Sequence, residues 1–140
     1  MTDNWVGFRS IPPRDRNRKL EKRKFDYLLD VEGPKVINNF LKWEQFESWF
    51  GTVEKFDARQ GGRISFTRDQ KQFHGAFSRI QIPKQIILVT ELHGEISMQL
   101  REGRQTKVIL RFQKALLRTE LDDWLIEVDR VVAKFLESLS

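Results

Sequence analysis

Hydrophobic residues recur along this chain with two different periods, and most stretches have the period of two that is typical of a strand. Residues 20–31 alternate between apolar and polar or mixed side chains, as at Phe25 and Tyr27, which predicts a first strand. Gly61 and Gly62 mark a reversal between two shorter strands. Further strands are predicted at 71–82, 85–92, 95–102 and 106–116. The pattern therefore predicts a sheet of about seven strands.

Two segments between the first and second strands have the period of a helix. Pro34 suits the first position of a helix, because the N–H that proline lacks has no partner there, and an apolar stripe follows it. We expect this helix to break near Lys42 and the next one to end at Gly51, since glycine adopts a left-handed conformation without a Cβ clash. The second helix places four rings on one side, at Trp43, Phe46, Trp49 and Phe50. We interpret these rings as hydrophobic core, with a pocket-lining ring as the alternative.

The C-terminal segment has the clearest helical pattern of the chain. Its apolar residues fall on one stripe, which comprises Leu121, Trp124, Leu125, Val128, Val132, Phe135, Leu136 and Leu139. The opposite side carries charged residues, among them Glu127. Thr119 is the predicted N-cap, with Asp122 three residues further on. Such a helix is about 30 Å long, enough to cross a small sheet.

Charge is concentrated at the start of the sequence. The chain has 140 residues and a net charge of +5, and residues 1–24 alone hold eight Lys or Arg against three Asp or Glu. We therefore predict a basic, flexible arm at 1–19 and one folded domain at 20–140. Because the remaining residues are formally neutral, we expect no binding of nucleic acid beyond weak contact through the arm.

Cysteine and long apolar runs are both missing from the sequence. Without cysteine there is no disulfide framework and no thiol nucleophile. The N-terminal residues lack the apolar segment of a signal peptide, and no run approaches the ~18 apolar residues of a membrane span. These features predict a soluble, cytoplasmic protein.

Three side chains are candidates for acid, base or ligand chemistry: His74, His93 and Glu91. His93 precedes Gly94 and is interpreted as a turn residue, and His74 as an exposed or hydrogen-bonded strand residue. Glu91 is either an exposed strand residue, which we favour, or a buried general acid with a raised pKa. Neither histidine has the spacing of a metal ligand. We therefore predict no catalytic residue, no metal and no cofactor, and interpret the chain as a binding domain rather than an enzyme.

One stretch of the chain resembles a known family. The run WFGTVEKFDARQGGRISF, followed by HGAF at 74–77 and IPK at 82–84, is similar to the heat-shock-chaperone ATPase activator homologues of the START-like (SRPBCC) superfamily, which also contains the Bet v allergens. The resemblance covers about residues 20–140. It implies an α+β helix-grip fold, a curved antiparallel sheet of about seven strands wrapped around a long C-terminal helix, with two short helices after the first strand. The chain departs from the usual pattern in lacking a Trp near the end of strand 86–90 and in carrying the basic arm.

The resemblance also implies a site. Across the superfamily, the space between the long helix and the concave face of the sheet holds apolar ligands. The implied function is therefore binding of a small apolar molecule, against Trp49, Phe66, Phe77, Met98, Trp124 and Val128. Two alternatives use the same fold: a chaperone-activator-like domain that binds a partner protein such as a chaperone, and a cyclase or hydrolase type of enzyme that uses the cavity. An interior filled by side chains would favour the protein-interaction alternative.

Overall fold

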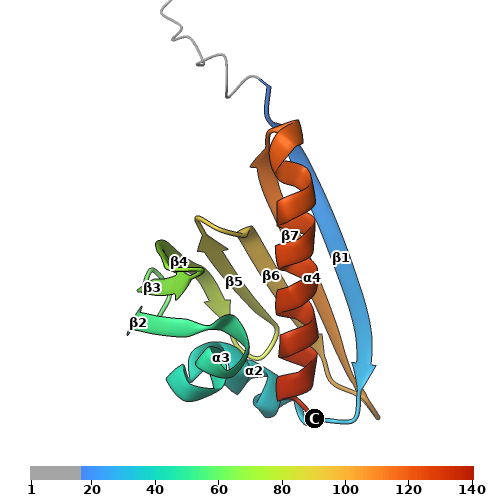
Figure 1. The fold of residues 1–140 in the computed structure, drawn as a ribbon. Coiled ribbons are helices and arrows are strands. Elements are labelled where there is room, and N and C mark those ends of the chain that lie inside the picture. Colours follow the sequence, from blue (N-terminus) through green and yellow to red (C-terminus); the bar gives the residue numbers. More distant parts are fainter. Residues whose placement is uncertain (1–16) are drawn as a thin grey trace, which may run out of the picture.

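A computed structural model of the chain describes residues 17–140. Its strands form one antiparallel sheet in the order β1-β7-β6-β5-β4-β3-β2 (Figure 1). The strands are β1 (Lys19–Leu29), β2 (Thr52–Phe56), β3 (Arg63–Arg68), β4 (Lys71–Gln81), β5 (Gln85–Thr90), β6 (Gly94–Arg101) and β7 (Thr106–Leu116). Residues 1–16 of the predicted arm lie outside the described residues, and Lys19 already belongs to β1.

The helices lie on one face of this sheet. α2 (Gly33–Leu41) and α3 (Trp43–Phe50) join β1 to β2, and the short 3-10 helix η1 (Arg118–Glu120) leads from β7 into α4 (Leu121–Ser138). α4 runs along β7 and β1, and its C-terminal end lies near α2 and α3 (Figure 1). This is the predicted α+β helix-grip fold, with a curved seven-stranded antiparallel sheet, a long C-terminal helix and two short helices after the first strand.

The predicted ends of the short helices are confirmed. Lys42 separates α2 from α3 with an extended backbone, φ −111° and ψ 129°. Gly51 ends α3 with φ 115° and ψ −168°, a conformation that is essentially restricted to glycine. The chain can therefore leave α3 and enter β2 at the very next residue, Thr52.

The predicted start of the long helix is wrong. Thr119 is not the N-cap of α4, because the helix begins two residues later, at Leu121. The carboxylate of Glu120 accepts the backbone N–H of Leu117 at 2.8 Å and so closes the turn of η1. The helical segment therefore begins with η1, and Thr119 lies inside this short helix rather than at an N-cap.

The hydrophobic core lies between the helices and the inner face of the sheet. Three of the four rings predicted for α3, those of Phe46, Trp49 and Phe50, are buried in it. Trp43 is the exception, since 44% of its surface is exposed. It is the first residue of α3, and its ring packs beside that of Phe56, with 5.9 Å between the ring centroids. The interpretation of Trp43 as a core residue was therefore wrong.

Candidate functional site

The six residues predicted to line a ligand cavity are all buried. They belong to one hydrophobic cluster, which includes Trp49, Phe66, Phe77, Met98, Trp124 and Val128. Rings of α3 lie between them: Phe46 is 5.4 Å from Trp49 and 6.4 Å from Phe77 between ring centroids, and Phe50 is 4.7 Å from Phe66. A ligand among these rings would have to displace packed side chains. Their role in binding stays a prediction.

A pocket of about 370 Å³ opens beside the N-terminal half of α4, and we call it the Trp124 pocket. It lies where the helix passes the β5–β6 turn and the end of β7, and Trp124 is the predicted ligand residue that lines it. Leu92 and Leu116 add apolar surface, and Lys114, Asp123 and Glu127 add charge. Small-molecule sites commonly have volumes of about 300–1,000 Å³, so this pocket suits a small ligand.

Beside this pocket, Glu127 is held by two buried side chains. Arg68, the last residue of β3, donates to Oε2 of Glu127 and to the backbone carbonyl of Phe50. Nε2 of His93 lies 2.8 Å from the same Oε2. The side chains of Arg68, His93 and Glu127 are 8%, 0% and 11% exposed. A carboxylate at this depth requires such partners, because an unpaired buried charge is costly.

The imidazole of His93 is neutral and fully hydrogen-bonded. The carboxylate of Glu127 needs a donor at Nε2, so in the neutral ring Nδ1 is the acceptor, and it takes the hydroxyl proton of Thr90 across 3.0 Å. The same hydroxyl oxygen accepts the backbone N–H of His93 at 2.8 Å. Burial lowers the pKa of His93 and outweighs the attraction of the Glu127 carboxylate, which would raise it. The rings of Phe50 and Phe66 lie 5.2 and 6.1 Å away.

The turn between β5 and β6 directs this imidazole inward. Gly94 follows it with φ 78°, and a Cβ at this position would lie 2.4 Å from the carbonyl oxygen of Gln113 in β7, so a larger residue does not fit. Nε1 of Trp124 donates to the backbone carbonyl of His93 at 3.0 Å. The turn is thus connected to α4 twice, once through Trp124 and once through Glu127.

Glu127 is ionised although it is largely buried. Burial alone would raise its pKa, but hydrogen bonds from His93 and Arg68 together hold the pKa below the usual value. Arg130 lies 4.0 Å from the other carboxylate oxygen, Oε1. Within residues 17–140, Oε1 accepts no hydrogen bond. One oxygen of a fixed carboxylate is therefore available beside the pocket.

Lys114 also lines the pocket, but its ammonium group already has partners. Its Nζ donates to the backbone carbonyls of Glu91 at 2.6 Å and Leu92 at 3.3 Å. Burial lowers the pKa of Lys114. This lysine therefore fixes the β5–β6 turn against β7 and is less available to a ligand than the carboxylate of Glu127.

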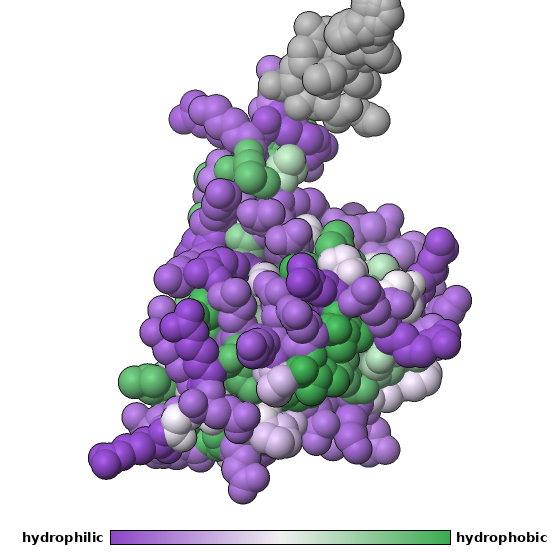
Figure 2. All heavy atoms as spheres, turned by 180° about the vertical axis from the view of Figure 1, so that it is seen from behind, coloured by the Kyte–Doolittle hydropathy of each residue, from purple (hydrophilic) through white to green (hydrophobic). Residues whose placement is uncertain are grey.

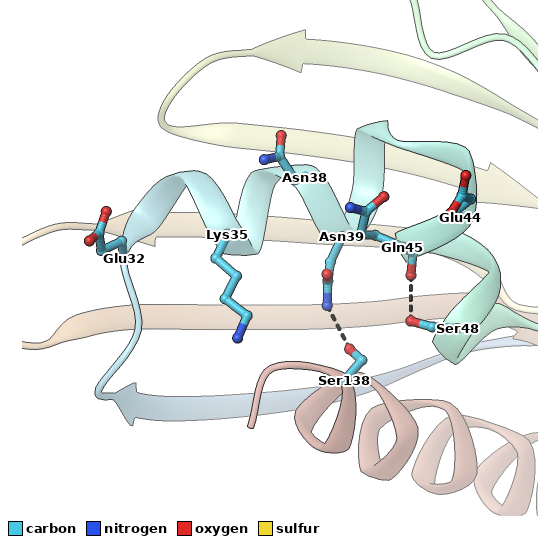
Figure 3. A pocket seen from close by; sticks show the side chains of 8 residues that line it. All are labelled: Glu32, Lys35, Asn38, Asn39, Glu44, Gln45, Ser48 and Ser138. Carbon is cyan, nitrogen blue, oxygen red and sulfur yellow. Dashed lines mark hydrogen bonds between the residues drawn. The ribbon is translucent and has the colours of Figure 1, made fainter.

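A second pocket, of about 640 Å³, opens at the other end of α4, and we call it the Ser138 pocket (Figure 3). Its lining is polar and comes from the start and end of α2, from α3 and from the last turn of α4: Glu32, Lys35, Asn38, Asn39, Glu44, Gln45, Ser48 and Ser138. Asn39 is the buried residue of this set, and its Nδ2 donates to Oγ of Ser138 at 2.5 Å. The charged side chains that line this pocket are exposed.

The three candidates for chemistry have different surroundings. Glu91 and His74 are both exposed, and Oε1 of Glu91 accepts the backbone N–H of His74 at 2.7 Å. Glu91 is a turn residue rather than a strand residue, because β5 ends at Thr90. His93 lies in a turn as interpreted, yet it is buried, since that turn folds against α4 and not into solvent.

Sequence reasoning missed the combination of Arg68, His93 and Glu127. The three residues come from a strand end, a turn and a helix, and no short motif connects them. One signal was present in the sequence: Glu127 follows Trp124 by three positions and directly precedes Val128, so it borders the apolar stripe of the helix. Where such a carboxylate becomes buried, it requires a buried partner.

The arrangement supports binding better than acid–base catalysis. Both ring nitrogens of His93 are occupied, and the carboxylate of Glu127 is fixed by Arg68, so this network offers a hydrogen-bond acceptor rather than a free base. Within residues 17–140, no group of three or more His, Cys, Asp or Glu could hold a metal ion. In the same part of the chain, no helix is both long enough and apolar enough to cross a membrane.

The family described as "Activator of Hsp90 ATPase homolog 1-like protein" matches residues 34–132, which is most of the chain. The chain belongs to this family. The match runs from the start of α2 through most of α4, so it includes the residues of the Arg68–His93–Glu127 network. Family membership agrees with the resemblance found in the sequence.

Solved structures share the fold of this activator-homologue domain. Mll3558 from Rhizobium loti matches with a TM-score of 0.73 at 12% identity, over 87% of this chain and 99% of that chain. The Aha1 dimer from Colwellia psychrerythraea matches with a TM-score of 0.67 at 18% identity, over 85% of this chain and 92% of that chain. CalU16 from Micromonospora echinospora matches with a TM-score of 0.65 at 18% identity, over 88% of this chain and 85% of that chain. At these identities the likeness shows the fold. No curated protein matches the sequence.

Proposed function

We propose that this domain binds a small molecule in the Trp124 pocket without transforming it. One observation supports the proposal: Trp124 and Glu127 are three residues apart on α4 and line one pocket with an indole ring and an ionised carboxylate. Leu92 and Leu116 extend the apolar part of the lining. The ligand therefore has an apolar body and carries a hydroxyl or amine, which donates to Oε1 of Glu127.

The other five residues predicted to contact a ligand lie deeper than Trp124, in the hydrophobic core. Trp49, Phe66, Phe77, Met98 and Val128 are packed in the core, and they contact the ligand only if its apolar body displaces rings behind Trp124. Such displacement costs packing energy, so we expect a small ligand to stay against Trp124.

A panel of small amphipathic alcohols and amines, with fatty acids for comparison, tests the proposal by thermal shift and tryptophan fluorescence. A ligand at a hundredfold excess over its Kd should stabilise the fold by about 2.7 kcal/mol. Asp123→Arg should weaken binding about tenfold or more, because residue 123 lines the pocket. Asp122→Arg is the matched control, since Asp122 lies in the same first turn of α4 outside that lining. Absence of any shift, or equal loss in both variants, contradicts the proposal.

A second function, binding of a partner protein, is favoured by the packed core. We propose that the chain acts as a chaperone-activator homologue, because residues at the positions of a ligand cavity pack against one another and because the family takes its name from an Hsp90 ATPase activator. The chain should then bind an Hsp90-class chaperone and raise its ATPase rate. An unchanged rate together with no co-sedimentation would exclude this function for the chaperone tested.

A further inference from the structure

The outer face of the sheet points away from α4 and from both pockets. On β1, Arg23 is directed at α4, where its Nη2 lies 3.2 Å from the carboxylate of Asp129. Lys22 and Lys24 therefore point to the other face, because side chains alternate along a strand. Pairing registers extend this outer face across the sheet in one row, Lys24, Arg111, Ser97, Ile87 and Arg79.

Basic side chains dominate this outer face. From β1 across to β4 the registers place six basic residues on it, which are Lys22, Lys24, Arg79, Arg101, Lys107 and Arg111. The acidic residues on the same strands and face are Asp26 and Glu95. Asp26 lies 3.7 Å from each of two of those lysines, so its charge is balanced. The outer face thus carries a clear excess of positive charge.

In the described part of the chain, four of the six basic residues have no acidic partner. Among residues 17–140, no carboxylate lies within 4.0 Å of the charged groups of Lys22, Arg79, Arg101 or Arg111. The two central arginines contact neutral groups instead, since Arg111 donates to Gln99 at 2.6 Å and Arg79 to Gln81 at 3.3 Å. These positive charges are therefore available to a negatively charged partner.

An apolar strip lies between these arginines. Ile87 is partly exposed, Val89 is 40% exposed, and Ala76 lies opposite Val89 on β4. Figure 2 shows this side of the molecule, with hydrophobic side chains gathered inside a largely hydrophilic surface. Protein interfaces commonly combine an apolar centre with a charged or polar rim. The outer face has this composition.

We infer that the outer face of the sheet binds an acidic, amphipathic segment of a partner protein, with apolar side chains on Ile87 and Val89 and carboxylates on Arg79 and Arg111. This inference rests on the partner-protein function proposed above and identifies its surface. A protein segment fits better than single-stranded nucleic acid, because bases stack on aromatic side chains, and the outer face of β1 and β4–β7 carries no Phe, Tyr or Trp.

A labelled amphipathic peptide of Glu and Leu is the probe, and fluorescence anisotropy is the measurement. The wild-type chain should bind it saturably, more tightly than a Glu peptide without Leu and more tightly than oligothymidine, and affinity should fall with salt. The double variant Arg79→Glu/Arg111→Glu should weaken binding about tenfold or more. Lys35→Glu/Lys134→Glu makes the same change of net charge on exposed helical positions and should leave binding nearly unchanged.

Four outcomes overturn the inference: no saturable binding, equal weakening by both double variants, oligothymidine bound as tightly as the peptide, or self-association of the chain through this face in place of peptide binding. The chaperone assay tests the proposed surface separately from the proposed partner function. If wild type and the Arg79→Glu/Arg111→Glu variant stimulate the chaperone equally, the surface is wrong and the partner function stands. If the wild type does not bind the chaperone but binds the peptide, the surface stands and the chaperone is the wrong partner.

Discussion

The two ends of α4 contain polar groups of different kinds. Beside the Trp124 pocket, Arg68, His93 and Glu127 are buried together, and each of them has a charged or hydrogen-bonding partner. The Ser138 pocket is larger, but its charged side chains are exposed to water. Burying charge costs free energy that a solvent-exposed charge does not. The buried network is therefore the better guide to function, although its pocket is smaller.

The largest effect should come from removing one member of the buried network. Arg68→Met leaves the carboxylate of Glu127 with His93 as its remaining buried partner, and we expect a loss of about 3–5 kcal/mol in the free energy of unfolding. Lys35→Met, at the Ser138 pocket, should change it by less than about 0.5 kcal/mol. Urea unfolding measures both. Similar losses in the two variants would contradict the contrast between the pockets.

A smaller effect should follow from removing one hydrogen bond of the indole. Trp124→Phe keeps an aromatic ring but leaves the backbone carbonyl of His93 without its donor, which should cost about 1–3 kcal/mol. Trp43→Phe is the matched control, because Trp43 is 44% exposed and should tolerate the change. Chemical unfolding measures the free energy of unfolding of both variants. A larger loss in Trp43→Phe than in Trp124→Phe would contradict this prediction.

At the Ser138 pocket, Ser138→Ala should lower the free energy of unfolding by about 0.5–1.5 kcal/mol, because Nδ2 of Asn39 then loses its acceptor. Ser140→Ala, two positions further on, is the control, because the hydroxyl of Ser140 donates to the carbonyl of Glu137 at an exposed position. A loss at Ser138 as large as that of Arg68→Met would show that this pocket also depends on a tightly coupled network.

The smallest effect should appear in the dependence of stability on pH. The pKa of His93 is lower in the folded protein than its ordinary 6.5, so the unfolded chain binds more protons below that value. Its contribution is therefore fully present above about pH 6.5 and is lost as the pH falls toward the folded pKa. Protonation of Glu127 causes a further loss of stability below about pH 4.5, because its pKa in the folded protein lies below the ordinary 4.5. Urea midpoints measured against pH test this. His93→Gln should reduce the decline of the midpoint that begins below about pH 6.5, and His74→Gln, at an exposed position, is the control.

Much of the fold follows from local patterns in the sequence. The alternation in β6 and β7, the break at Lys42 and the stop at Gly51 are each decided by a few neighbouring residues, and the structure agrees with them. The start of α4 was predicted wrongly because a short 3-10 helix, closed by the carboxylate of Glu120, precedes α4 and contains Thr119. Helix ends depend on such small differences.

The candidate site did not follow from local patterns. Arg68, His93 and Glu127 meet only after β3, the β5–β6 turn and α4 have packed together, so their positions depend on tertiary structure. His93 was interpreted as a turn residue because glycine follows it, and the sequence does not say which way a turn faces. The burial of Trp124 and Val128 was easier to predict, since one apolar stripe requires it.

The order of strands in the sheet also sets the order in which the chain can fold. β1 pairs with β7 alone, from Lys19 opposite Leu116 to Leu29 opposite Thr106, while β2 to β7 pair with their neighbours in sequence. On a ribosome, the meander from β2 can begin to form before β1 has its partner strand, because the residues of β7 that pair with β1 follow it by 77 (Leu29 to Thr106) to 97 (Lys19 to Leu116) positions. Until then β1 is an unpaired strand with apolar residues along one side. During synthesis, this segment is therefore exposed to aggregation until β7 has been made.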